Sequence, residues 1–237
     1  EFYHRQLGKG LGIVFVFPFL YFTVRGYLKR RLWYTLSVLL GIGSMQGFIG
    51  WWMVKSGLNQ TLGKDYKKKD VKVAPYRLAI HFTTAVILFG VLFNQGLFLV
   101  RKHPGIRRNF SEYAVLKASR HAFYGALFWN FITLISGSLM AGNDAGKIIN
   151  TFPKMGDIWI PNHLHFTDSK EFNYFKDLLE NQFIVHFNHR AIATFNISVV
   201  LLNFYKLLSY GIVSSNVGKA YLTLTLLTVF QYCMGIV

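Results

Sequence analysis

Residues 32–54 read LWYTLSVLLGIGSMQGFIGWWMV, 23 residues without an Asp, Glu, Lys or Arg. A helix of about 20 apolar residues spans the hydrocarbon core of a bilayer, and uncharged runs of the same length fill residues 78–100 and 121–143. Shorter uncharged runs lie at 10–24, 191–205 and 220–237, and basic residues beside them can reach the membrane interface. The sequence therefore predicts an all-α, polytopic membrane protein with six transmembrane helices in these 237 residues.

The composition excludes several other classes of protein. Charged residues make up 15% of the chain, against about 25% in a soluble domain, and 52% hydrophobic residues exclude intrinsic disorder. The single cysteine, Cys233, excludes an intrachain disulfide and a multi-cysteine metal site. The net charge of +16 does not indicate nucleic-acid binding, because the Lys and Arg residues gather at the ends of the apolar runs, as in membrane proteins.

The charged loops predict an orientation. The loops at 25–31, 101–120 and 206–219 are basic, and we expect them on the cytoplasmic or matrix side. Residues 141–186 contain six acids and four lysines and belong on the opposite side. The loop at 55–75 is an exception, because it carries six lysines against two aspartates and yet falls on that opposite side.

A repeated pattern indicates two homologous halves. His4-Arg5 and His189-Arg190 each precede an apolar run, and each histidine is followed 42 residues later by Gln-x-x-x-Gly, beginning at Gln46 and Gln231. We expect a first half at 1–100, an inner connecting loop at 101–120 and a second half at 121–237. Because residue 1 is not Met and residue 237 falls inside an apolar run, we also expect the chain to be part of a longer protein.

Three histidines are candidate metal ligands. His4, His81 and His189 each lie near the start of a helix that runs from the outer to the inner side. An ionisable residue in a membrane helix is by default a functional hypothesis, and imidazole is a common axial ligand of haem iron. His4 and His81, on two helices at similar depth, can face each other across an iron. The alternative is that each imidazole forms a hydrogen bond between helices.

Nearby charged residues extend this candidate site. Arg5, Arg77 and Arg190 fall at the same outer level, where they can pair with haem propionates or simply reach the interface. Glu1 precedes His4 by three residues and shares a helix face with it. A carboxylate there can transfer protons, or it can be a solvated residue at a helix start.

Several longer motifs resemble the heme A synthase family. They are Glu-x-x-His-Arg at 1–5, QGFIGWWMVKSGL at 46–58, PYRL at 75–78 before His81, AGNDAG at 141–146, NTFPKMG at 150–156, and Gln182 followed by FNHR at 187–190. They occur in the family's order from one end of the chain to the other. The 53–58 run and the Asn-Thr-Phe-Pro segment resemble the mitochondrial and alphaproteobacterial branch.

The resemblance implies eight transmembrane helices in two four-helix bundles, of which this chain has six. It implies oxidation of a ring methyl group of heme O to the formyl group of heme A, for cytochrome c oxidase. His4 and His81 would ligate the substrate haem, Glu1 would assist the chemistry, and His189 would ligate a heme B cofactor whose second ligand lies outside this chain.

The resemblance also implies partners and a location. Electrons would come from a ferredoxin-type donor. Heme O synthase and cytochrome oxidase assembly factors are candidate partners, a homo-oligomer is a candidate state, and nucleic acid is not a partner. The membrane would be the mitochondrial inner membrane, with a bacterial plasma membrane as the alternative.

Two other functions remain open. A bis-histidine membrane cytochrome that only transfers electrons would account for the histidines and arginines but not for Glu1 beside His4. A transporter built from repeats needs a polar site near the bilayer midplane, whereas the ionisable residues here gather at the outer edge.

Overall fold

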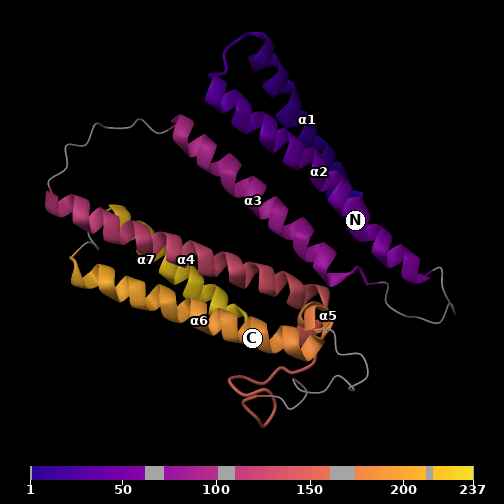
Figure 1. Ribbon diagram of the computed structural model, residues 1–237, viewed down its shortest axis with the longest axis vertical. Helices are drawn as coiled ribbons and strands as arrows, with labels where there is room; N and C mark the ends of the chain where they lie inside the picture. Colours follow the sequence, from indigo (N-terminus) through magenta and orange to yellow (C-terminus); the bar gives the residue numbers. More distant parts are fainter. Residues whose placement is uncertain (1, 62–71, 101–109, 161–173, 212–215, 237) are drawn as a thin grey trace. The chain divides into compact units, whose positions relative to one another are not determined.

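The structure is a computed structural model that describes residues 2–61, 72–100, 110–160, 174–211 and 216–236 (Figure 1). Its elements are α1 (Phe2–Val24), α2 (Arg30–Thr61), α3 (Pro75–Val100), α4 (Phe110–Gly142), the short 3-10 helix η1 (Ala145–Lys147), α5 (Tyr174–Glu180), α6 (Gln182–Ser209) and α7 (Asn216–Met234). The only pairing of the β type among the described residues is an isolated bridge between Met155 and Ile158. The predicted all-α class is confirmed.

Five described helices have the length and composition to cross a membrane, namely α1, α2, α3, α4 and α6. The sixth expected span forms the helix α7 but is not among these five, because Lys219 and Gln231 lower its mean hydropathy. The two 15-residue runs belong to much longer helices, since α1 begins at Phe2 and α6 begins at Gln182. The protein is therefore a multi-pass membrane protein whose polar helix ends carry the candidate histidines.

The chain divides into two compact units, Glu1–Lys102 and His103–Val237. In the first unit, α2 packs against α3 and, less extensively, against α1 (Figure 1). The turn between α1 and α2 uses Gly26 at φ +69°, with Gly26 N donating to Thr23 O and Tyr27 N donating to Phe22 O. This left-handed glycine cap ends α1 and reverses the chain.

In the second unit, α6 is the central helix and packs against α4, α5 and α7. Its first turn is capped by Asn181, whose side chain accepts hydrogen bonds from Phe183 N and Ile184 N. The buried core contains Tyr221, whose ring stacks on Phe204 and meets Phe123 edge-on at a centroid distance of 4.9 Å. Aromatic packing therefore joins α4, α6 and α7.

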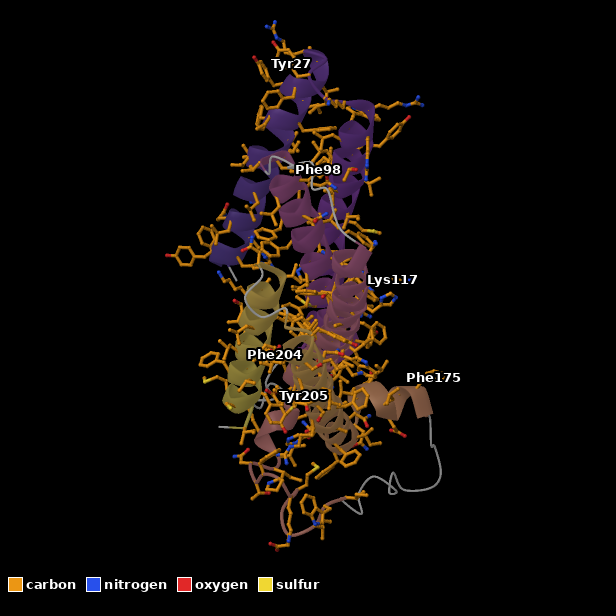
Figure 2. The ribbon with its side chains drawn as sticks, turned by 90° about the vertical axis from the view of Figure 1, so that its left-hand side faces the viewer. Tyr27, Phe98, Lys117, Phe175, Phe204 and Tyr205 are labelled. Atoms are coloured by element: carbon orange, nitrogen blue, oxygen red, sulfur yellow. The ribbon has the colours of Figure 1, made fainter. Side chains whose placement is uncertain are left out.

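Large apolar side chains project outward from both units. Exposed examples are Tyr27, Phe98 and Tyr205 (Figure 2). The neighbour of Tyr205 in the chain, Phe204, instead faces the core. Aqueous surfaces rarely show contiguous apolar area of this kind, so these helix faces suit contact with lipid.

We predict that Tyr221→Ala lowers the thermal unfolding midpoint of the detergent-solubilised protein, at a cost of about 3 kcal/mol for a large-to-small core substitution. The conservative control Tyr221→Phe keeps the ring between Phe123 and Phe204 and should unfold close to the wild-type temperature. Equal midpoints for Tyr221→Ala and the wild type would show that this cluster does not hold α7.

Candidate functional site

The first unit brings His4 and His81 together. The ring centroids of His4 on α1 and His81 on α3 are 6.4 Å apart, with an angle of 66° between the ring planes. His4 is exposed and His81 is partly buried. Two residues 77 positions apart in the chain, on helices joined through α2, thus form one imidazole pair.

This separation fits two axial ligands of one metal ion. With about 2 Å for each metal–nitrogen bond and about 1.2 Å from nitrogen to ring centre, two such rings have centroids about 6.4 Å apart. The angle between the planes imposes no restriction, because each imidazole can rotate about its metal–nitrogen bond. Haem iron needs only axial ligands from the protein. The pair therefore fits haem.

Helix α2 supplies the surface on which His81 lies. A Cβ atom added at Gly50 would come within 3.2 Å of His81 Cε1, so the imidazole ring rests directly on the glycine backbone. One turn earlier, the amide group of Gln46 reaches to 2.8 Å from His81 Nδ1 and also contacts Thr84. Glycine at position 50 permits the close approach, and Gln46 engages the ring nitrogen that faces α2.

The second unit repeats this local arrangement around His189. A Cβ atom added at Gly137 on α4 would come within 3.2 Å of His189 Cε1. The neighbouring residue Ser136 places its Oγ 2.8 Å from His189 Nδ1. Each of these two histidines thus has a helical glycine beneath its ring and a polar side chain of the same helix at Nδ1.

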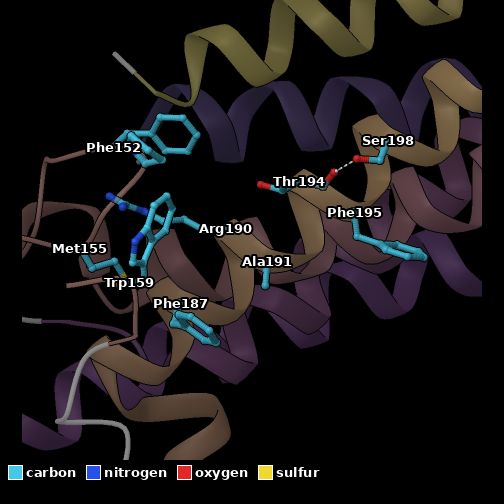
Figure 3. A pocket seen from close by; sticks show the side chains of 10 residues that line it. Phe152, Met155, Trp159, Phe187, Arg190, Ala191, Thr194, Phe195 and Ser198 are labelled. Atoms are coloured by element: carbon cyan, nitrogen blue, oxygen red, sulfur yellow. Dashed lines mark hydrogen bonds between the residues drawn. The ribbon is translucent and has the colours of Figure 1, made fainter.

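Arg190 binds backbone carbonyls of the segment that follows η1, residues 148–160. Its Nη1 donates to Thr151 O at 2.7 Å, and its Nη2 donates to Ile149 O at 3.0 Å. Its Nε donates to Nε2 of the buried His186, one turn earlier on α6. Figure 3 shows Arg190 between Phe152 and Trp159 in an open pocket of about 490 Å³. The guanidinium fork therefore holds backbone carbonyls of the segment over the start of α6.

Arg77 has a similar position in the first unit. Its Nη1 donates to Trp52 O at 2.8 Å, and its guanidinium carbon lies 4.4 Å from the centroid of the Trp52 ring. This contact ties the start of α3 to α2 near the level of His81. Arg5 is exposed on α1. Propionate binding by the three arginines stays a prediction, and Glu1 lies outside the described residues.

Some residues of the site were not predicted from the sequence. His186 falls in an expected loop, but the structure places it inside α6 and buries it against Arg190. Ser136 and Gly137 lie in an ordinary apolar run, and the small-residue stretch Ser136-Gly137-Ser138 is the one local signal that a ring can approach α4 closely. Gln46 and Gly50 stand out in the sequence through the repeat and the motif at 46–58, but neither signal indicates their contact with His81.

We predict that Gly50→Ala lowers the haem bound by the His4–His81 pair by about tenfold, because the added methyl group displaces the ligand ring by a few tenths of an ångström. The matched control is Gly47→Ala on the same helix, where a Cβ meets nothing within 4 Å. Pyridine haemochrome absorbance per mole of purified protein measures the effect. Equal haem content in the two variants would contradict a role for Gly50 in seating His81.

The same comparison applies to the second unit. Gly137→Ala should lower the haem ligated by His189, whereas Gly125→Ala on α4 meets nothing within 4 Å and should leave it unchanged. Alanine favours a helix over glycine at either position, so a loss confined to Gly137→Ala identifies the contact with the imidazole as the cause.

We predict that Arg190→Lys loosens the segment after η1, because an ammonium group cannot replace a fork that donates to several carbonyls. The Met155 and Gly156 amides, bonded to Ile158 O and Thr151 Oγ1, should exchange hydrogen about tenfold faster, as expected for one lost charge-assisted bond. Lys147→Ala, which removes an exposed pair with Asp144, is the control and should change little. Unchanged exchange in Arg190→Lys would refute the fastening role.

Comparison with known proteins gives one family model and several curated relatives that match most or all of this chain. A family model described as "Cytochrome oxidase assembly protein" (COX15-CtaA) matches residues 1–237. Heme A synthase COX15 of Arabidopsis thaliana is 43% identical over 82% of this chain and 41% of its own length. The Saccharomyces cerevisiae protein of the same name is 35% identical over 81% of this chain and 43% of its own length.

A bacterial relative gives a comparable match. Heme A synthase of Caulobacter sp. is 35% identical over 81% of this chain and 50% of its own length. The chain thus spans about half the length of the curated relatives that it matches. No solved structure matches it. Since the family model covers all 237 residues, this chain belongs to the COX15-CtaA family of cytochrome oxidase assembly proteins.

Proposed function

We propose that this chain is part of a heme A synthase, an enzyme that oxidises a ring methyl group of heme O to the formyl group of heme A. The names of the relatives support this function. The observation in the structure that carries it is the 6.4 Å separation of His4 and His81, which suits two axial ligands of the substrate's iron.

The residues of the first unit bind and orient the substrate. His4 and His81 hold the iron from opposite sides, and Gly50 lets His81 lie against α2. Arg77 fixes the start of α3 by its bond to Trp52 O. Glu1, one turn before His4 in the sequence, provides a carboxylate for proton transfer beside the substrate.

The second unit has a different role in this proposal. His189 would hold the iron of a heme B cofactor, which when bound supplies electron transfer. Arg190 and His186 keep the outer segment packed on the start of α6, so that water is restricted around this ligand. Arg5, Arg77 and Arg190 lie close in sequence to the candidate histidines and are the proposed partners of the haem propionates.

The proposal extends to partners and location. Conversion of a methyl to a formyl group removes four electrons from the substrate carbon. In two successive hydroxylations dioxygen is the oxidant: each O2 takes two electrons from the carbon and two electrons with two protons from the donor side, and one of its oxygen atoms leaves as water. The resulting diol loses water to give the formyl group, and a ferredoxin-type protein is the proposed electron donor. The basic loop at 101–120 has a charge that would attract an acidic protein. The mitochondrial inner membrane is the proposed location, with heme O synthase and oxidase assembly factors as neighbours.

The test is to extract and identify the haems of the purified full-length protein, expressed with a supply of heme O. The wild type should contain heme B together with heme O or heme A. His4→Ala and His81→Ala should each lower heme A formation by at least about a hundredfold, since either change removes a ligand that positions the substrate. His121→Ala, which alters a histidine of α4 bonded to Lys117 O, is the control and should retain wild-type product.

Heme B alone, unchanged after addition of heme O and reductant, would contradict the proposal and favour a bis-histidine cytochrome that only transfers electrons. Product formation at the wild-type rate by His81→Ala would contradict the assignment of the substrate site to the first unit.

A further inference from the structure

We propose that Ser136 is a positioning residue that selects the tautomer of the haem-ligand histidine His189. In this inference, Ser136 accepts the Nδ1 proton of His189, which leaves the Nε2 lone pair of the ring for iron. The inference rests on the proposed haem ligation and assigns a separate task to one residue of α4.

The Ser136 hydroxyl can donate only one hydrogen bond, and this decides its role toward His189. Ser136 Oγ lies 2.8 Å from Thr133 O and 2.8 Å from His189 Nδ1. A hydroxyl has one proton to donate, and a carbonyl can only accept it. When Ser136 donates to Thr133 O, its oxygen accepts the Nδ1 proton of His189. This chain of donors satisfies both groups and leaves Nε2 unprotonated.

Gln46 contacts the same ring nitrogen of His81, but as a donor. Its Nε2 lies 2.8 Å from His81 Nδ1 and 3.3 Å from His81 O, and its Oε1 accepts from Ala85 N at 2.9 Å and from Thr84 Oγ1. A carbonyl oxygen can only accept and a backbone N–H can only donate, so His81 O and Ala85 N fix the orientation of the amide. An acceptor at Nδ1 is therefore a feature of His189 and Ser136.

The two glycines make these contacts specific to one face of each ring. Gly50 is one turn from Gln46 on α2, and Gly137 is adjacent to Ser136 on α4, so the same helix supports the ring and contacts Nδ1. Among the described residues, neither His81 nor His189 uses Nε2 in a hydrogen bond. Both imidazoles are therefore held through Nδ1, and at His189 the acceptor Ser136 Oγ leaves Nε2 available as a ligand.

This arrangement has an electronic consequence. A hydrogen bond from Nδ1–H to an acceptor raises the basicity of a metal-bound imidazole. A more basic ligand favours ferric over ferrous iron, so removal of the acceptor should shift the midpoint potential to a more positive value. A purely packing role for Ser136 would not produce a shift of defined sign.

The test compares Ser136→Ala, Ser136→Thr and Ser138→Ala in the full-length, haem-loaded protein. Ser138 is the matched control, because it is also buried on α4 and its Oγ donates to Ile135 O, as Ser136 Oγ does to Thr133 O. Ser136→Ala should weaken haem binding at His189 by about 10- to 100-fold and make the midpoint potential more positive. A tenfold change in ferric-to-ferrous preference corresponds to about 59 mV. Ser136→Thr retains a hydroxyl and should restore both properties, and Ser138→Ala should resemble the wild type.

Gln46→Leu is a further comparison, because Gln46 contacts His81. It should leave the affinity and the potential of the haem at His189 unchanged. Wild-type affinity and potential in Ser136→Ala would overturn this inference alone, because the haems would still be bound. A wild-type protein without haem would overturn the proposed function as well, and His189→Ala with unchanged haem content would overturn the assignment for Ser136.

Discussion

A polar group inside a bilayer must find its partner within the protein, and this constraint governs the helices of this chain. Serine and threonine side chains satisfy it by donating to the carbonyl one turn earlier. Examples of this bond are Thr35 to Arg31 O, Ser44 to Leu40 O, Thr133 to Trp129 O, Ser198 to Thr194 O, Thr225 to Tyr221 O and Thr228 to Leu224 O. The helices can therefore carry many hydroxyl groups while their outer faces remain apolar.

The candidate ligand histidines depart from this pattern in an informative way. His81 and His189 each satisfy one ring nitrogen through a neighbouring helix, and each ring lies against a helical glycine where an added Cβ atom would come within 3.2 Å of Cε1. The position of each ring is therefore determined by helix packing, and at His189 the second nitrogen is the one left for a ligand. A ligand site on rigid helices, supported by hydrogen bonds behind the ligands, is the arrangement that gives metal centres reproducible geometry.

Sequence periodicity and charge predict the membrane helices well but their polar ends poorly. The uncharged run at 32–54 lies within α2, whereas the run at 191–205 is less than the whole of α6, because Arg190 and His186 remain helical once they bond to each other and to carbonyls. The pairing of His4 with His81 was expected from their similar depth, and the structure places the rings together. Ser136 could not be distinguished from Ser138 in the sequence, since only the register of α4 against α6 decides which hydroxyl meets His189.

The arginines illustrate the same limit. Position alone indicates a role at the outer level of the site, yet the structure shows Arg77 bonded to Trp52 O and Arg190 bonded to Ile149 O and Thr151 O. A guanidinium group has five donors, so fastening the backbone and binding a propionate are compatible tasks. The structure shows the hydrogen bonds to the backbone. These bonds limit the directions from which a propionate can reach the same guanidinium groups.

A cryo-electron microscopy map of the haem-loaded, full-length protein tests the central claim most directly. The account predicts one iron between His4 Nε2 and His81 Nε2, and a second iron on His189 Nε2 with Ser136 Oγ still within hydrogen-bond distance of Nδ1. An iron bound through Nδ1 of His81 or His189, or haem held by other residues while His4 and His81 stay unligated, would contradict it.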